Sequence, residues 1–403
     1  MLNALYRSAL NIMIFVAMAA AAMPAGNGDE TSQASQSIFH VVPTPDPGSN
    51  CSLFAVSASS ANDIWAVGLS AIHFGGAKWT AFPIATISGS VIDSLTGVAD
   101  ISPTDAWAVG QVNEGLAHPG QVIEHWDGAS WSVFQGPTLP AGAEPLLNGM
   151  SAVSANDIWA VGSLLDHHLG VLNFLFEHWD GTSWTATAIE SGDASLLAVS
   201  ADASDDAWAV GFSGPENDTS RTLVMHWDGA TWKRVESPSV GSGANQLNGV
   251  LALAPDNVWA VGFSTHSPTP PPGQYRVPTK TLIEHYDGTS WSVVSSPNVG
   301  PNSQYQSNDL LGITAVSSTN IWAFGSLDAA NGSGNVRTLL LNWDGNTWSV
   351  APSPNPTKGD FLDDVLFAGV VPSPGNVWIV GSEAEFVTGD PILGTLALHA
   401  TIQ

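Results

Sequence analysis

Histidines and carboxylates are the residues of this sequence that could bind a metal ion or transfer protons. Asp166, His167 and His168 are consecutive, and imidazole and carboxylate groups are common ligands of divalent metals. Adjacent histidines do not have to point the same way, so we interpret this segment as a polar loop and expect no metal site. Six further histidines recur along the chain, with Asn342 in the one remaining place: His73, His125, His178, His226, His285 and His399.

The spacing of these six histidines argues against one shared site. They lie in successive copies of an internal repeat, on a strand that we expect to be an outer one, so they should be far apart. We therefore interpret them as a buried polar contact that each repeat makes. Glu124, Glu177 and Glu284 directly precede three of them and receive the same interpretation.

Other candidate binding residues lie in long polar segments that interrupt the repeat. Glu216 and Asp218 belong to a small acidic segment, and Tyr275 and Arg276 belong to a proline-rich one. Tyr305 is a further aromatic residue that we expect to be exposed. Because variable loops on a rigid scaffold often carry binding residues, these positions and Asp166-His167-His168 are the predicted partner-binding set.

The 17 tryptophans at first suggest a surface on which sugars stack. All of them, however, occupy one of three recurring places, and an aromatic residue in the same place of every repeat is typical of packing. The first place is Trp65, Trp107, Trp159, Trp208, Trp259, Trp322 and Trp378. The second is Trp79, Trp131, Trp184, Trp232, Trp291 and Trp348, and the third is Trp126, Trp179, Trp227 and Trp343.

One repeat contains four short segments of strand type, which we call a to d. In 247–294 these segments are Leu247–Leu253, Val258–Gly262, Thr281–Tyr286 and Trp291–Val294. Asp287-Gly288 separates the last two, which is a strong hairpin signal. Asp63, Asp105, Asp157 and Asp206 precede segment b, with Asn257, Asn320 and Asn376 elsewhere. This exchange of Asp and Asn indicates a turn-forming role.

The number and size of the repeats predict an all-β, seven-bladed β-propeller with four antiparallel strands in each blade. Ten residues before each segment-b tryptophan stands a glycine or an alanine: Ala55, Gly97, Gly149, Ala198, Gly249, Gly312 and Ala368. Small residues suit strands that converge on one axis. The a–b and c–d connections are short, whereas b–c and d–a are long, so one face should be plain and the other elaborated.

The two ends of the chain complement each other. The last repeat stops after a segment c near Leu393–His399, without a segment d. Phe39 to Pro45 resembles Trp291 to Pro297 and stands directly before the first segment a. We predict that Phe39–Val42 completes the last blade, which removes an exposed sheet edge.

Two segments resemble the kelch repeat family. Val258-Trp259-Ala260-Val261-Gly262 is similar to the kelch strand b, and His285-Tyr286-Asp287-Gly288-Thr289-Ser290-Trp291 is similar to its Tyr-Asp…Trp segment. The chain has one glycine where kelch repeats have two, and mostly Trp where they have Tyr. The resemblance implies a propeller of the bacterial secreted type, with the architecture of the galactose oxidase central domain. No positions match the copper ligands of that enzyme, so its activity is not implied.

Composition limits the possible partners and the location. The chain has 403 residues, with 36 acidic and 9 basic ones and a net charge of −27, which argues against nucleic acid because phosphate binding needs clustered Lys and Arg. Residues 1–25 have the pattern of a signal peptide, 26–37 of a polar linker, and 38–403 of one propeller domain. An uncleaved N-terminal anchor is the alternative. Cys51 is the only cysteine, so no intrachain disulfide forms.

These observations favour a secreted or cell-surface protein, monomeric, without a cofactor and without a transmembrane segment in the mature chain. The primary hypothesis is a non-catalytic propeller that binds a protein or glycan through the long b–c and d–a loops. A hydrolase or lyase that acts on polysaccharide through acidic residues of the same face is the alternative, since the separation of paired carboxylates is not visible in sequence. A structural surface scaffold is the third hypothesis.

Overall fold

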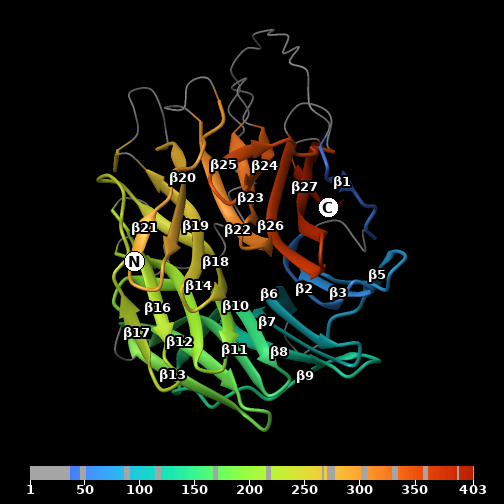
Figure 1. Cartoon of the computed structure of the whole chain (residues 1–403). Coiled ribbons are helices and arrows are strands. Elements are labelled where there is room, and N and C mark those ends of the chain that lie inside the picture. Colours follow the sequence, from blue (N-terminus) through green and yellow to red (C-terminus); the bar gives the residue numbers. More distant parts are fainter. Residues whose placement is uncertain are drawn as a thin grey trace.

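The computed structural model describes residues 37–45, 51–85, 91–113, 119–166, 171–214, 219–265, 267–269, 277–300, 306–328, 335–356, 362–387 and 390–402. Within these ranges the chain forms 28 β-strands and no helix. In Figure 1 the colours pass around a circle from blue to red, so that the strands nearest the N-terminus lie beside the last ones.

Five sheets have four antiparallel strands each, in chain order. They are β2 (Leu53–Ser60), β3 (Asp63–Gly68), β4 (Ala71–Phe74) and β5 (Trp79–Phe82); β6 (Val91–Ser102), β7 (Asp105–Asn113), β8 (Pro119–Trp126) and β9 (Trp131–Val133); β10 (Ala143–Ser154), β11 (Asp157–Asp166), β12 (Val171–Trp179) and β13 (Trp184–Glu190); β14 (Ala194–Ala203), β15 (Asp206–Ser213), β16 (Arg221–Trp227) and β17 (Trp232–Val235); and β18 (Asn245–Ala254), β19 (Asn257–Thr265), β20 (Thr279–Tyr286) and β21 (Trp291–Val293).

The sixth sheet has eight strands. One half is β22 (Asn308–Ser317), β23 (Asn320–Asp328), β24 (Val336–Trp343) and β25 (Trp348–Ala351), and the other is β26 (Leu362–Ser373), β27 (Asn376–Val387), β28 (Asp390–Thr401) and β1 (His40–Val41). A single parallel bridge between Val336 and Asp363 joins the two halves. Apart from this bridge, each half has the same antiparallel order as the other sheets.

The first strand of each group lies innermost. Strand β2 contacts β6, β6 contacts β10, and so on through β14, β18, β22 and β26, which contacts β2 again and closes the circle. A β-bulge interrupts each of these inner strands directly before the predicted Gly or Ala. The bulged residues are Phe54, Thr96, Asn148, Leu197, Asn248, Leu311 and Phe367.

Close approach of backbones limits the size of the residue at two places of the repeat. A Cβ on Gly249 would lie 3.1 Å from the Cα of Gly312, so the inner strands do approach as closely as the sequence predicts. The glycine that ends the Trp-Ala-Val-Gly segment is even more restricted, because a Cβ on Gly162 would lie 1.8 Å from the carbonyl oxygen of Leu146. The backbone of β11 therefore packs directly against the backbone of β10.

The predicted Asp-Gly hairpins are present. Gly128, in the turn between β8 and β9, has a φ of 92°, which L-residues rarely adopt. The Oδ1 of Asp127 accepts hydrogen bonds from the backbone N–H groups of Ala129 and Ser130, both at 2.9 Å. These bonds, that of Ser130 most strongly, hold the pKa of Asp127 below its usual value. The a–b turn is shorter than expected, with only Ala155 and Asn156 between β10 and β11.

Tryptophans form the contacts between neighbouring groups of strands, as predicted. Trp159 of β11 packs edge-to-face on Trp232 of β17, with ring centroids 5.2 Å apart. Equivalent contacts continue around the circle and cross the place where the two chain ends meet, where Trp378 lies 5.3 Å from Trp79. Large aromatic surfaces are thus removed from water between the sheets, which is the main source of stability in a stack of this kind.

The predicted closing strand is present as well. His40 and Val41 of β1 pair with His399 and Leu398 of β28. Phe39 is buried, and its ring lies 5.0 Å from that of Trp322 in an edge-to-face contact. The N-terminal strand therefore supplies the outermost strand of the last group.

Candidate functional site

The predicted partner-binding residues lie mostly outside the part of the chain that the structure describes. Asp166 is described: it is the last residue of β11 and pairs with Ala143 and Val171. The other predicted residues fall outside the described ranges: His167, His168, Glu216, Asp218, Tyr275, Arg276 and Tyr305. All of these belong to b–c or d–a connections, as the sequence indicates.

The recurring histidines each meet the Asp or Asn that begins the second strand of their own group. The Nε2–Oδ1 distances are 2.6 Å for His73–Asp63, 2.9 Å for His125–Asp105, 2.8 Å for His178–Asp157, 2.7 Å for His226–Asp206, 2.9 Å for His285–Asn257 and 2.7 Å for His399–Asn376. In the β22–β25 half, Asn342 donates to Asn320 at 3.0 Å instead. The predicted polar contact is therefore present in each repeat, but the prediction that it is buried is wrong, because the histidine side chains are only partly buried.

These pairs also correct one expectation. The repeated Asp or Asn accepts a hydrogen bond from histidine, and this contact explains the exchange better than a turn-forming role does. Either side chain supplies the one oxygen that the histidine needs. The imidazole also lies on the tryptophan of the strand that the Asp or Asn begins, as His178 of β12 does on Trp159 of β11, with centroids 4.1 Å apart. The triad of acidic residue, histidine and tryptophan is structural, since each copy belongs to a different sheet.

Three buried glutamates occupy a strand position that holds an apolar residue in the other groups of strands. Glu124, Glu177 and Glu284 have no exposed surface. The equivalent residues of the other groups are Ile72, Met225, Leu341 and Leu398. Each glutamate faces the preceding group of strands, where the Oε1 of Glu124 accepts a hydrogen bond of 3.1 Å from the backbone N–H of Ala85.

Burial controls the ionisation of these carboxyls. It raises the pKa of Glu124 to about 7, partly offset by the Ala85 hydrogen bond. It raises the pKa of Glu177 to about 7 and that of Glu284 to about 8, where the side chains of Gln121 and Ser237 act in the opposite direction. Removing a carboxylate from water disfavours its charged form, so these groups hold protons at pH values where surface glutamates do not.

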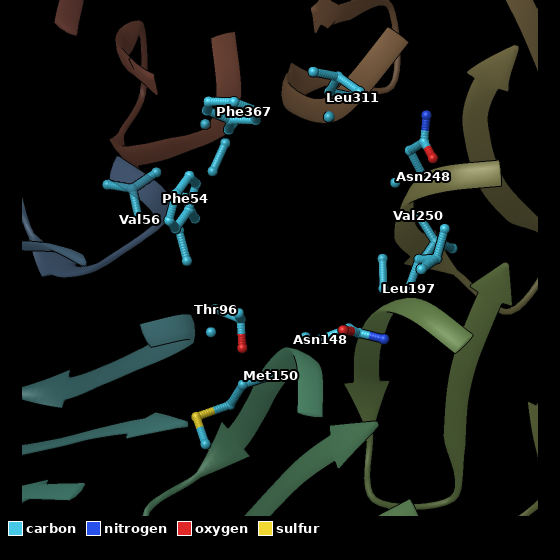
Figure 2. Close-up of a pocket in the computed structure, with 18 of the residues that line it drawn as sticks. Phe54, Val56, Thr96, Asn148, Met150, Leu197, Asn248, Val250, Leu311 and Phe367 are labelled. Carbon is cyan, nitrogen blue, oxygen red and sulfur yellow. The ribbon is translucent and has the colours of Figure 1, made fainter. Parts of the chain in front are cut away.

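The axis of the molecule contains a cavity of about 250 Å³. Residues of all the inner strands line it, including every bulged residue (Figure 2). The lining contains no acidic, basic or cysteine side chain, and Thr96 supplies its only hydroxyl. Among the described residues, no group of three or more His, Cys, Asp or Glu is placed to hold a metal ion. The side chains that line the cavity therefore offer no acid, base or strong nucleophile.

The bulged residues with polar side chains also fasten neighbouring inner strands. Thr96 donates to the carbonyl oxygen of Leu147 at 2.7 Å, and Asn148 donates to that of Leu196 at 2.7 Å. Asn248 donates to the carbonyl oxygen of Leu310 at 2.8 Å. Sequence reasoning missed this set, although alignment of the repeats would have shown a polar residue before the small one in three of them.

Comparisons with known proteins agree with this architecture. No protein-family model matches the sequence, and a search of curated proteins gives no match. The structure is similar to that of YCF48 bound to D1 peptide, with a TM-score of 0.53 and 14% identity, over 92% of this chain and 97% of that one. It is similar to the WD40 β-propeller domain of Doa1, with a TM-score of 0.53 and 10% identity, over 91% and 98% of the two chains.

The fold is a β-propeller. The likeness to Trypanosoma rangeli sialidase is weaker, with a TM-score of 0.45 and 11% identity over 80% of this chain and 56% of that one, and it carries no argument for catalysis. Identities this low relate these propellers by fold alone. Within the described residues, no helix of the propeller is long and apolar enough to cross a bilayer.

Proposed function

We propose that this chain is an exported, kelch-like, seven-bladed propeller that binds a protein or glycan partner without catalysis. In this proposal residues 1–25 direct export and 26–37 are a linker. Residues 38–403 form one monomeric domain at the cell surface or outside the cell. The count of seven treats the eight-stranded sheet as two blades, in support of which a single bridge joins its halves. The kelch assignment rests on the Trp-Ala-Val-Gly and Asp-Gly segments.

One observation carries the proposal of a binding face. Connections at one edge of the sheets are uniform, with two residues between the first and second strands and four in the hairpins such as 180–183. At the other edge they range from 69–70 to 266–278 for b–c, and from 191–193 to 294–307 for d–a. Packing of the sheets does not require such variation, and variable loops on a rigid scaffold often carry binding residues. The peptide named with the YCF48 propeller is consistent with a binding role for this architecture.

A glycan array probed with the mature protein tests the proposal. We expect binding that is lost when residues 267–276 are replaced by a short Gly-Ser connection, and kept when Thr289→Ala alters a hairpin of the opposite edge. Release of reducing sugar from a bound polysaccharide would support the hydrolase or lyase instead. Absence of both binding and hydrolysis, in the array and with secreted proteins as ligands, would contradict the binding role and favour the scaffold.

A further inference from the structure

The axial cavity has two chemically different sides, and this difference does not depend on the proposed binding face. Figure 2 shows Phe54 and Phe367 together on one side, with Asn148 and Asn248 across the cavity from them and Leu197 and Val250 between the two asparagines. An apolar protein cavity of roughly 150 Å³ holds a benzene molecule. About 250 Å³ therefore leaves room for a benzene ring with a substituent.

The apolar side lies where the first and last inner strands meet. The rings of Phe54 and Phe367 pack edge-to-face with centroids 5.4 Å apart, and both side chains are only partly buried. Leu311 continues this side along β22 (Figure 2). Two partly exposed phenyl rings inside a cavity offer an apolar group both burial and edge or face contacts.

The polar side presents mainly hydrogen-bond acceptors. The amide nitrogens of Asn148 and Asn248 are turned to the backbone oxygens of Leu196 and Leu310. The Thr96 hydroxyl is likewise turned to a backbone oxygen. The side-chain oxygens of the two asparagines remain as acceptors; that of Asn248 already receives one bond, from Gln246 at 2.7 Å. A ligand that donates hydrogen bonds can use these side-chain oxygens.

The distribution of charged residues also favours a cationic ligand. The inner strands carry acidic residues and no Lys or Arg; Glu144 of β10, Asp309 of β22 and Asp363 of β26 stand at or near the strand ends next to the long connections. The described basic residues belong to outer strands or the segments beside them: Lys78, Arg221, Lys233, Arg234, Lys280 and Arg337. The net charge of −27 favours the approach of cations over that of anions.

We propose that the axial cavity is a binding site for a small protonated amine with an apolar end. The apolar end packs on Phe54 and Phe367, and the ammonium group donates to the side-chain oxygens of Asn148 and Asn248. The hydrogen bonds and the acidic surroundings offset the loss of hydration that a charged group suffers on entry. The amine is either a free molecule or the end of a lysine side chain.

Calorimetric titration of the mature protein with four compounds at pH 7 tests this assignment. Benzylammonium, benzyl alcohol and benzoate share one ring and differ in charge, and butylammonium represents a lysine side chain. We expect benzylammonium to bind roughly tenfold more tightly than benzyl alcohol, as for one charge-assisted hydrogen bond, with no detectable binding of benzoate. Tighter binding of butylammonium than of benzylammonium would identify a lysine side chain as the natural source.

Variants assign the two sides separately. Leucine already occupies the bulge at Leu197 and Leu311, so Asn248→Leu and Phe367→Leu suit the fold. Asn248→Leu should remove the preference for the amine over the alcohol, and Phe367→Leu should weaken both. Phe134→Leu, outside the cavity, should change neither. Equal binding of benzoate and benzylammonium, no binding of any compound in the millimolar range, or an unchanged preference in Asn248→Leu would overturn the proposal.

Discussion

Strands β21 and β1 make the same contacts, although one is continuous with its sheet and the other comes from the far end of the chain. Trp291 of β21 packs on Trp208 of the preceding group, with centroids 5.5 Å apart, and Phe39 beside β1 packs on Trp322 at 5.0 Å. Behind β21, the hydroxyl of Thr281 meets that of Ser296 at 2.9 Å. Behind β1, the hydroxyl of Thr395 meets that of Thr44 at 2.7 Å.

The two strands differ in how far apart in sequence their partners are. Thr281 and Ser296 are 15 residues apart, whereas Thr44 and Thr395 are 351 apart. Closing the longer loop costs on the order of 3 kcal/mol more, since each doubling of loop length adds about 0.6 kcal/mol. The native contacts of the repeat are thus reproduced at the chain ends, but a larger entropic cost opposes them. The last group should therefore be the most easily opened part of the propeller.

Among the changes that test this comparison, deletion of residues 38–45 should have the largest effect on stability. It removes β1 and Phe39 and exposes the edge of β28. Loss of one buried aromatic residue alone costs about 3–5 kcal/mol, so the melting temperature should fall by roughly 4–7 °C in calorimetry. Deletion of residues 26–36 is the control and should leave the melting temperature unchanged. An unchanged curve for the first deletion would show that β1 does not close the ring.

At the junction of β23 and β26 a large residue, Phe324, faces a glycine, Gly369. At the neighbouring junction of β19 and β22 both equivalent residues are aliphatic. Val261 of β19 lies near Ile313 of β22, whereas Phe324 of β23 lies near Gly369 of β26, where an added Cβ would be 2.8 Å from the phenylalanine ring. Gly369→Val should cost about 1–3 kcal/mol by overpacking, and Phe324→Val a similar amount by leaving a void.

The double variant Phe324→Val with Gly369→Val should cost at least about 1 kcal/mol less than the sum of the two single variants. Urea unfolding measures all three. The pair Val261→Phe with Ile313→Gly, which moves the exchange to the β19–β22 junction, is the matched control and should show coupling of the same sign. Additive single effects would mean that the size exchange is not compensation.

Glu284 should make the stability of its sheet depend on pH, whereas Leu398 in the equivalent place should not. Burial raises the pKa of Glu284 from 4.5 to about 8, so the folded state keeps this proton to a higher pH than the unfolded state does. Its contribution is complete below about pH 4.5 and is lost as the pH rises toward 8, at up to about 1.4 kcal/mol per pH unit. Glu284→Gln and Glu284→Leu should both flatten the free energy of unfolding between pH 5 and 8. A wild-type slope in both variants would contradict the assignment.

Asn257→Asp and Asn376→Asp should have the smallest effects. Each gives a histidine the carboxylate partner found elsewhere, and the pKa of His285 or His399 should rise by about one pH unit because the imidazolium is favoured. Stability should change by less than about 1 kcal/mol. Burial lowers the pKa of both histidines, and His40 of β1 lowers that of His399 further. Asp287 raises the pKa of His285, so NMR titration should give His399 the lower value, and His40→Gln should reduce the difference without removing it.

Much of the fold could be predicted from sequence because it depends on residues that recur. The closing strand was found from one match between Phe39–Pro45 and Trp291–Pro297, and the contacts of Phe39 and Thr44 confirm it. The small residues on the inner strands were also predicted with the correct reason, a close approach of backbones. Because the same structural position recurs in each repeat, one sequence shows several times which residue types that position accepts.

The site was less accessible to sequence reasoning. The partnership of Asp157 with His178 joins two residues 21 positions apart, and the pattern shows that both recur but not that they touch. Glu177 was interpreted together with the histidines as part of a buried polar contact, and it is buried, but the pattern does not show that its side chain faces the preceding group of strands. The axial cavity is lined by the bulged residues of the inner strands. A bulge in an inner strand does not alter the spacing of the tryptophans in the second strands, so the repeat pattern does not reveal it.

The pairing of β1 with β28 also orders events in time. A ribosome makes His40 long before His399, so β1 has no partner strand while most of the chain is being synthesised. Until β28 emerges, the aromatic surface of Trp322 that Phe39 covers is also open. A factor that holds the N-terminal segment extended would therefore delay the pairing of β1 with β28 and leave the earlier groups of strands free to form.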